Sequence, residues 1–136
     1  MKERNALVGG WRGVILWLLR MAESGEIFWF RSVESPGPVE GLWFVYVLQS
    51  GDGALYVGQT SHVRRRLTQH EGGLGTKHTR EHGSPRLVFY QGPYSLQKAV
   101  EREAQLKRWS RAKKAALIRG DYELLRLLAR SREVGE

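Results

Sequence analysis

The sequence predicts an α+β domain, in which a small, three-stranded, mainly antiparallel sheet is flanked by helices. Residues 42–48 and 54–57 are rich in aromatic and β-branched residues, and Gly-Asp-Gly at residues 51–53 separates them. This arrangement is typical of a β-hairpin. A third run of the same kind, residues 86–90, follows a helical stretch, and helical patterns continue to the C-terminus. The expected order is β-β-α-β-α-α, followed by a C-terminal helix.

The second strand is expected to end at Gly58, and a helix over residues 63–70 to follow it. Thr60 and Ser61 are the two candidate caps of this helix, because a hydroxyl oxygen can accept a hydrogen bond from a backbone N–H of the first turn. The chain is expected to turn again at Gly-Pro, residues 92–93, directly after the third strand.

Three arginines occupy the first turns of the expected helix. Arg64, Arg65 and Arg66 stand at the end where the helix dipole favours negative charge, so they oppose that dipole. His70 follows Arg66 by four residues and therefore shares its face. The arrangement indicates an anionic partner opposite the arginines, although a solvated basic surface would show the same pattern.

Three more helices are expected after the third strand, at residues 96–109, 111–119 and 122–130. Their candidate caps are Ser95, Ser110 and Asp121. Glu103 lies on or beside the apolar stripe of the first of these helices. A carboxylate on an inward-facing stripe is costly unless it is paired, hydrogen-bonded or bound to a metal ion.

Charge divides the chain into three parts. Residues 41–120 carry 14 of the 22 Lys and Arg residues but 5 of the 14 Asp and Glu residues. A domain this basic is expected to bind polyphosphate, by phosphate neutralisation and counterion release. Residues 1–40 are expected to form an N-terminal extension, either flexible or preceding the true start of the protein. Residues 121–136 are expected to form a C-terminal helix and tail.

Other features exclude several classes of protein. The chain has no cysteine, which excludes a disulfide framework and thiolate metal sites. An apolar run at residues 14–19 resembles the core of a signal peptide, but Arg20 follows it and no small-residue cleavage site is evident. No apolar run approaches about 18 residues, so no membrane span or membrane partner is expected. A cytoplasmic location fits these features.

Four residues together indicate phosphodiester hydrolysis, which needs an activated water, positive charge near the phosphate and usually a divalent cation. Tyr46 and Tyr56 lie on adjacent strands of a tight hairpin, so their hydroxyl groups can face one site. Arg66 offers a planar fork for phosphate oxygens. Glu103 offers a hard oxygen ligand for Mg²⁺. Each residue alone is usually structural or solvated, and only the combination indicates a nuclease.

The same residues occur in a pattern that resembles the GIY-YIG nuclease motif. Val-Tyr-Val at residues 45–47 and Tyr-Val-Gly at residues 56–58 look like its two halves. Arg66 lies ten residues after the second tyrosine, and residues 99–107 contain an Ala-x-x-x-Glu-x-x-x-Lys pattern. Two further segments resemble the small, single-domain bacterial UPF0213-like branch of this superfamily: residues 73–80 and residues 109–114.

The resemblance implies endonuclease activity on nucleic acid, DNA rather than RNA, with one divalent cation (Mg²⁺ or Mn²⁺) held by Glu103. It also implies that Arg66 binds the scissile phosphate and that Tyr46 and Tyr56 position or deprotonate the attacking water. A free tyrosine ionises near pH ~10, so Tyr56 acts as a base only if Arg66 or the metal favours its phenolate. His70 is a supporting phosphate contact, a proton acceptor or a structural histidine. The basic residues expected to contact nucleic acid are Arg64, Arg65, Lys77, Arg80, Lys107, Arg111, Lys113 and Lys114.

Three positions depart from the family pattern. Phe44 replaces the first glycine, Gln59 stands where some relatives have lysine, and His62 stands where aspartate is common. A non-catalytic nucleic-acid-binding module that kept the fold and charge is therefore the alternative function, although such a module would gain little from Glu103. A third interpretation is a protein-interaction adaptor that uses the leucines of residues 124–128, but it does not explain the charge.

Overall fold

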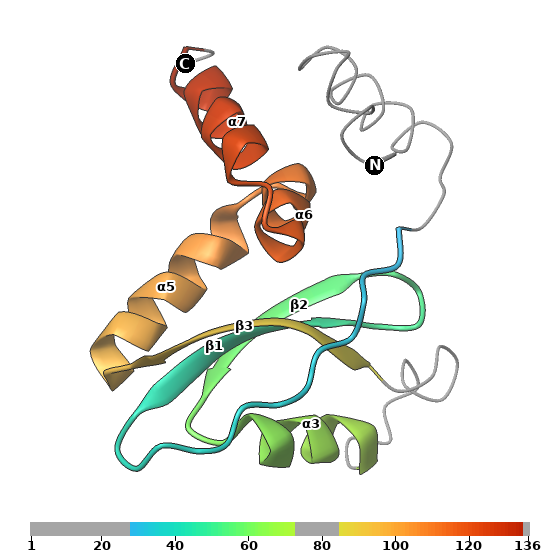
Figure 1. The fold of residues 1–136 in the computed structure, drawn as a ribbon, viewed down its shortest axis with the longest axis vertical. Helices are drawn as coiled ribbons and strands as arrows, with labels where there is room; N and C mark the ends of the chain where they lie inside the picture. Colours follow the sequence, from blue (N-terminus) through green and yellow to red (C-terminus); the bar gives the residue numbers. More distant parts are fainter. Residues whose placement is uncertain (1–27, 73–84, 135–136) are drawn as a thin grey trace.

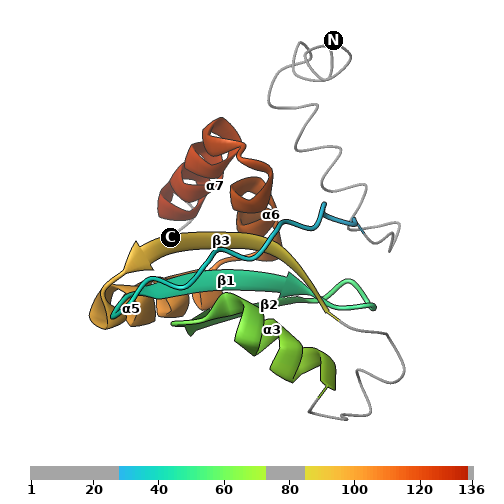
Figure 2. The same ribbon diagram turned by 60° about the horizontal axis from the view of Figure 1, so that its bottom comes forward.

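The computed structural model describes residues 28–72 and 85–134, and it confirms the α+β class. The sheet is antiparallel with strand order β2-β1-β3, formed by β1 (Trp43–Gln49), β2 (Leu55–Thr60) and β3 (Arg86–Tyr94). One face is covered by α3 (Val63–Gly72), and the other by α5 (Leu96–Arg108) and α6 (Arg111–Arg119) (Figures 1 and 2). The last helix, α7 (Tyr122–Val134), packs on α6. The central strand β1 is therefore covered on both faces.

The β1–β2 hairpin forms where the sequence predicts it, but β2 continues to Thr60 and does not end at Gly58, because Gln59 and Thr60 still pair with β1. The backbone N–H of Gly53 donates to the carbonyl of Ser50 at 2.8 Å, and the N–H of Ser50 donates to the carbonyl of Ala54 at 3.0 Å. Gly53 adopts a φ of 88°, in the left-handed region that glycine enters without steric cost. The turn closes the hairpin and sets the register between its two strands.

Strand β3 is longer than predicted, because it continues to Tyr94 instead of ending at Tyr90. Gly92 and Pro93 were expected to turn the chain, but both lie within the strand. β3 is an edge strand, where a proline need not cost a ladder hydrogen bond. Gly92 has a φ of 133°, and a Cβ there would lie 2.9 Å from the backbone oxygen of Trp43. The strand therefore relies on glycine for its close approach to β1.

Three predicted helix caps are confirmed, and the cap of α3 differs from the prediction. Ser95, Ser110 and Asp121 each accept a hydrogen bond from the backbone N–H three residues further on. Helix α3 is capped by His62, whose Nδ1 accepts from the N–H three residues further on at 3.2 Å. Thr60, one of the two expected caps, instead accepts from the N–H of His62. In the described ranges, no helix is long and apolar enough to cross a membrane.

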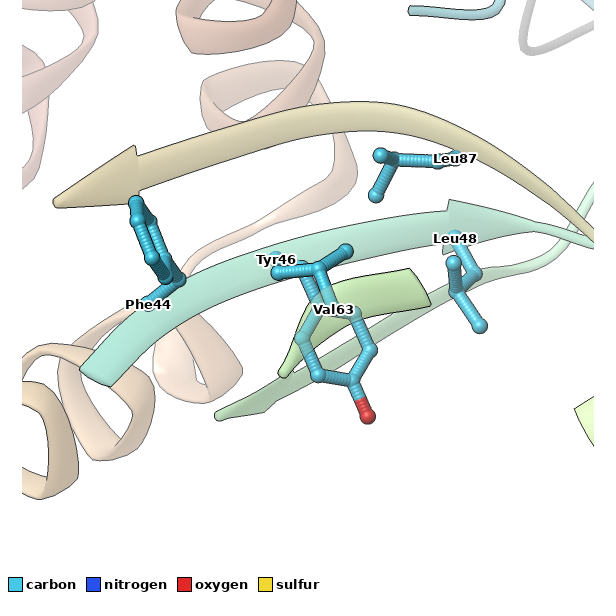
Figure 3. Packing of buried hydrophobic residues seen from close by; sticks show 5 residues of the cluster. All are labelled: Phe44, Tyr46, Leu48, Val63 and Leu87. Atoms are coloured by element: carbon cyan, nitrogen blue, oxygen red, sulfur yellow. The ribbon is translucent and has the colours of Figure 1, made fainter. Parts of the chain in front are cut away.

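The sheet separates two apolar layers. The α3 face holds a cluster of Phe44, Tyr46, Leu48, Val63 and Leu87 (Figure 3). The opposite face holds a cluster of Val45, Ala99, Leu106 and Leu117, which joins β1 to α5 and α6. Phe44 is 3% exposed, so the residue that replaces the first motif glycine serves as a core residue.

Residues 28–33, which we call the strap, also pack on the sheet, although residues 1–40 were expected to form an extension. Phe30 is 5% exposed and joins a third core cluster with residues of β1 and β3. Its N–H donates to Oε1 of Gln49 at 2.9 Å, and Nε2 of Gln49 donates to the carbonyl of Phe28 at 2.7 Å. Packing of the domain therefore begins before residue 41.

Candidate active site

Tyr46 is the buried centre of the site. It lies on β1, is 6% exposed, and belongs to the cluster on the α3 face (Figure 3). Its direct partner across the hairpin is Gly58 of β2. A Cβ at Gly58 would overlap with the hydroxyl oxygen of Tyr46 and with the ring carbon that carries it. Because Gly58 has no side chain, the Tyr46 hydroxyl can lie directly above β2 at this position.

Two charged side chains act on this hydroxyl from different helices. Burial raises the pKa of Tyr46 above its ordinary value, the Arg66 guanidinium opposes this rise, and the Glu103 carboxylate adds to it. Arg66 comes from α3 and Glu103 from α5, the helices on opposite faces of the sheet. The net increase in pKa means that Tyr46 is protonated at neutral pH and can donate a hydrogen bond.

Glu103 lies between two buried residues of α5. Ala99 is 0% exposed and Leu106 is 1% exposed, so this stripe of the helix faces the sheet. The Glu103 side chain is 21% exposed, and Nζ of Lys107 lies 3.5 Å from its Oε1. This ion pair offsets part of the cost of burying the carboxylate, as the sequence requires. The carboxylate is thus shielded by the fold but still reachable from solvent.

The three arginines of α3 are exposed, and His62 holds the backbone of two of them. The N–H of Arg66 donates to the carbonyl of His62 at 3.1 Å. The N–H of Arg65 donates to Nδ1 of the same histidine at 3.2 Å. His62, which departs from the family pattern, therefore holds the first turn of α3, which carries Arg66.

Tyr56 lies on the same face of the sheet as Tyr46 but in a different environment. It pairs with Leu48, two positions along the hairpin from the pair that Tyr46 makes, and it is 45% exposed. Directly opposed residues of antiparallel strands share a face, so both tyrosine rings project toward the α3 side. One tyrosine is therefore buried beside two charges, and the other is open to water.

Several predicted contacts lie outside the described part of the molecule. Lys77 and Arg80 precede residue 85 and follow residue 72, and the side chain of His70 is also outside it. Lys107 is described and pairs with Glu103. The sequence-based hypotheses for Lys77, Arg80 and His70 therefore stay predictions.

The basic residues of α6 differ from the expected row of nucleic-acid contacts. Lys113 is 9% exposed, and its Nζ lies 4.6 Å from the centre of the Trp109 ring. The guanidinium of Arg111 donates to the carbonyl of Gly53 at 2.8 Å. Burial, followed by the nearby Arg111, lowers the pKa of Lys114. Lys113 thus packs within the fold, where a backbone phosphate has little access to it, and Arg111 links α6 to the hairpin turn.

The donor set fits a cation that needs few protein ligands. The described ranges contain no group of three or more His, Asp and Glu residues that could hold a metal ion. Mg²⁺ often takes one or two carboxylates and keeps several of its waters, so the single carboxylate of Glu103 is sufficient. Oε1 of Gln59, the residue after Gly58, is buried and has no hydrogen-bond partner among the described residues.

Residues 42–116, more than half of the chain, match the family model described as the GIY-YIG catalytic domain. The chain belongs to the GIY-YIG family. A UPF0213 protein of Streptococcus pneumoniae serotype 4 is 42% identical to it over 75 residues, 55% of this chain and 76% of the relative. A UPF0213 protein of Natronomonas pharaonis is 41% identical over 75 residues, 55% of this chain and 88% of the relative.

One solved structure is also similar to this GIY-YIG chain. The solution NMR structure of a UPF0213 protein from Bacillus halodurans is 38% identical, covers 61% of this chain and 92% of that chain, and has a TM-score of 0.39. Family membership supports nuclease-type activity on nucleic acid, and GIY-YIG nucleases typically use divalent metal ions. The names of the UPF0213 relatives state no activity.

Proposed function

We propose that this GIY-YIG protein is a metal-dependent endonuclease that hydrolyses phosphodiester bonds, with DNA as its substrate. The observation that supports this most strongly is that the buried Tyr46 hydroxyl, which fills the space above Gly58, feels the charges of both Arg66 and Glu103. Cleavage of a phosphodiester requires a cation for the phosphate, an oxygen ligand for a metal ion and a hydrogen-bond donor. A protein that only binds nucleic acid would need the arginine but not a carboxylate beside the phosphate path.

Arg66 binds the scissile phosphate in this proposal. Its side chain is exposed, so a phosphate can reach it, and its planar fork can donate two parallel hydrogen bonds to phosphate oxygens. Tyr46 keeps its proton, because burial raises its pKa, and it donates to a phosphate oxygen or to the attacking water. The buried tyrosine therefore orients the reacting groups and does not take up their proton.

Glu103 would hold the divalent cation. When bound, such an ion supplies positive charge to the phosphate and makes a nearby water more acidic. Lys107, which pairs with Glu103, has a side chain that is 56% exposed, so it can turn into solvent and free the carboxylate. In the absence of the ion, Lys107 provides the positive charge that Glu103 needs.

Tyr56 is the proposed proton acceptor. The oxygen of the attacking water forms a bond to phosphorus, and a water proton passes to the Tyr56 phenolate. The bond from phosphorus to the leaving sugar oxygen breaks, and that oxygen takes a proton from solvent. Tyr56 suits this step because it is 45% exposed and can exchange its proton with solvent. Tyr56→Phe should therefore slow single-turnover cleavage by orders of magnitude, and more than Tyr46→Phe. Near wild-type rates with the wild-type pH profile in Tyr56→Phe would eliminate this role.

The decisive experiment compares two neighbouring glutamates of α5. Cleavage of linear, nicked and branched DNA and of RNA is measured with Mg²⁺, with Mn²⁺ and with EDTA. Glu103→Gln keeps the shape of the side chain but removes the anionic ligand, so metal-dependent cleavage should be lost. Glu101→Gln is the matched control, because Glu101 is exposed and accepts a hydrogen bond from Gln97.

Three outcomes would contradict the proposal. Turnover of Glu103→Gln within about threefold of wild type, or cleavage unaffected by EDTA, would show that the metal assignment is wrong. Binding to nucleic acid without cleavage of any substrate, with either ion, would identify a non-catalytic binding module. Faster cleavage of RNA than of DNA would overturn the proposed substrate.

A further inference from the structure

His62 joins the end of β2 to the first turn of α3. Its backbone N–H donates to Oγ1 of Thr60 at 3.1 Å, and the Thr60 hydroxyl donates to the carbonyl of His62 at 3.4 Å. That carbonyl also accepts from the N–H of Arg66 at 3.1 Å, while Nδ1 of the ring accepts from the N–H of Arg65 at 3.2 Å. Thr60 is 6% exposed, so the anchor of this network is buried. One residue therefore ties the backbone of Arg66 to the strand that carries Gly58.

The hydrogen bond to Arg65 requires one protonation state of the histidine ring. An imidazole nitrogen accepts a hydrogen bond only when it carries no proton, so the neutral ring has its proton on Nε2. Protonation of Nδ1 would set an N–H donor against the N–H of Arg65. It would also add positive charge at the positive end of the helix dipole, beside three arginines, and the first turn of α3 has no acidic residue to offset it.

We propose that His62 is a positioning residue, which holds Arg66 in place while its ring is neutral and loosens the first turn of α3 when the ring is protonated. This inference rests on the proposed function, because Arg66 is the phosphate-binding arginine there. The ligand affected is a backbone phosphate of the nucleic acid. Cleavage should therefore fall at a pH low enough to protonate the His62 ring.

The charged and titratable groups that act on one another at the site come from three elements. They are Arg66 of α3, Tyr46 of β1 and Glu103 of α5. Burial raises the pKa of Tyr46, so its hydroxyl stays protonated at neutral and acid pH. His70, on the same helix, is a second histidine, and the experiment has to separate the two.

The first test is a pH profile of kcat/KM between about pH 5 and 8.5. His62→Asn and His62→Asp keep an oxygen that can accept from the N–H of Arg65, but neither residue titrates like histidine. Wild type should lose about five- to tenfold more activity at the acid end than either variant, which is the effect of losing one helix cap. The kcat/KM of His62→Ala should be lower than that of wild type at all pH values, since the cap is absent throughout.

The second test needs no cleavage. In an NMR titration of the full-length protein, the amide signals of Arg65 and Arg66 should shift with the same midpoint as the His62 ring, and they should not do so in His62→Asn. His70→Asn, on the same helix, should retain the amide shifts of Arg65 and Arg66, which separates the two histidines. An oligonucleotide-binding titration over the same pH range should show the corresponding loss of affinity in wild type but not in His62→Asn.

The outcomes separate this inference from the proposed function. The positioning role would be overturned if the fall in kcat/KM at low pH persisted in His62→Asn. It would also be overturned if the amide signals of Arg65 and Arg66 did not shift with the same midpoint as the His62 ring. Wild-type protein that cuts no substrate at any pH would overturn the nuclease proposal instead. In that case the amide titration and the oligonucleotide binding would still decide whether protonation of His62 displaces Arg66.

Discussion

The two edges of the sheet differ in how their polar groups are satisfied. Beside β3, the strap satisfies groups that an edge would otherwise leave open: the N–H of Val33 donates to the carbonyl of Leu87 at 2.9 Å. Gln49 is 0% exposed, and its amide bonds to the backbone of the strap. Beside β2, Tyr56 is 45% exposed and Oε1 of Gln59 is buried without a partner among the described residues.

In the proposed function, this difference places stability at one edge and chemistry at the other. An exposed strand edge is a liability, and proteins commonly cover it. The strap does so beside β3 and adds the buried ring of Phe30. Beside β2, Gly58 leaves room for the Tyr46 hydroxyl, and Arg66 and Glu103 act on that hydroxyl. The edge that the proposed substrate would reach is thus the edge that the fold leaves less covered.

The largest expected effect concerns the stable edge. Phe30→Ala should lower the free energy of unfolding by about 3–5 kcal/mol, because it removes a buried aromatic side chain. Trp29→Ala is the matched control. Trp29 is 49% exposed, and the guanidinium carbon of Arg86 lies 5.5 Å from the centre of its ring, so its loss should cost at most about 1 kcal/mol. Urea unfolding followed by circular dichroism measures both. Equal losses in the two variants would show that the strap adds no core.

The next effect concerns the catalytic edge. Arg66→Lys keeps the charge but loses the two-pronged geometry, so kcat should fall by about 10²–10³, with folding unchanged. Arg64→Lys, two residues away on the same helix, should lose far less and chiefly in binding, with its salt dependence largely kept. Single-turnover kinetics and circular dichroism of both variants make the comparison. Similar losses at both positions would remove the special role of Arg66.

The smallest effect is expected for Gly58→Ala in β2, which should reduce both stability and activity. The added Cβ would meet the Tyr46 hydroxyl, and forcing a methyl group into such a space costs about 1–3 kcal/mol. Gly37→Ala is the control, since a Cβ at Gly37 meets no atom within 4 Å. Thermal unfolding and cleavage rates should both decline in Gly58→Ala and stay near wild type in Gly37→Ala. A fully active Gly58→Ala protein would show that the hydroxyl need not lie above β2.

Features that depend on a few neighbouring residues were predictable from the sequence. The caps at Ser95, Ser110 and Asp121 and the turn before Ala54 are each closed by groups at most four residues apart. The end of β3 was predicted too early, because Gly92 and Pro93 are tolerated only where β3 lies at an edge. That edge position is a property of the assembled sheet, which a local pattern does not contain.

The α+β class, the hairpin, the GIY-YIG pattern and the need of Glu103 for a partner can be read from the amino-acid sequence. The burial of Tyr46, the exposure of Tyr56 and the stacking of Lys113 on Trp109 depend on the folded chain. The physical reason is that burial and charge at a side chain depend on elements distant in the chain. Gln49, for example, bonds to backbone groups 19 and 21 residues away, and no spacing pattern marks such partners.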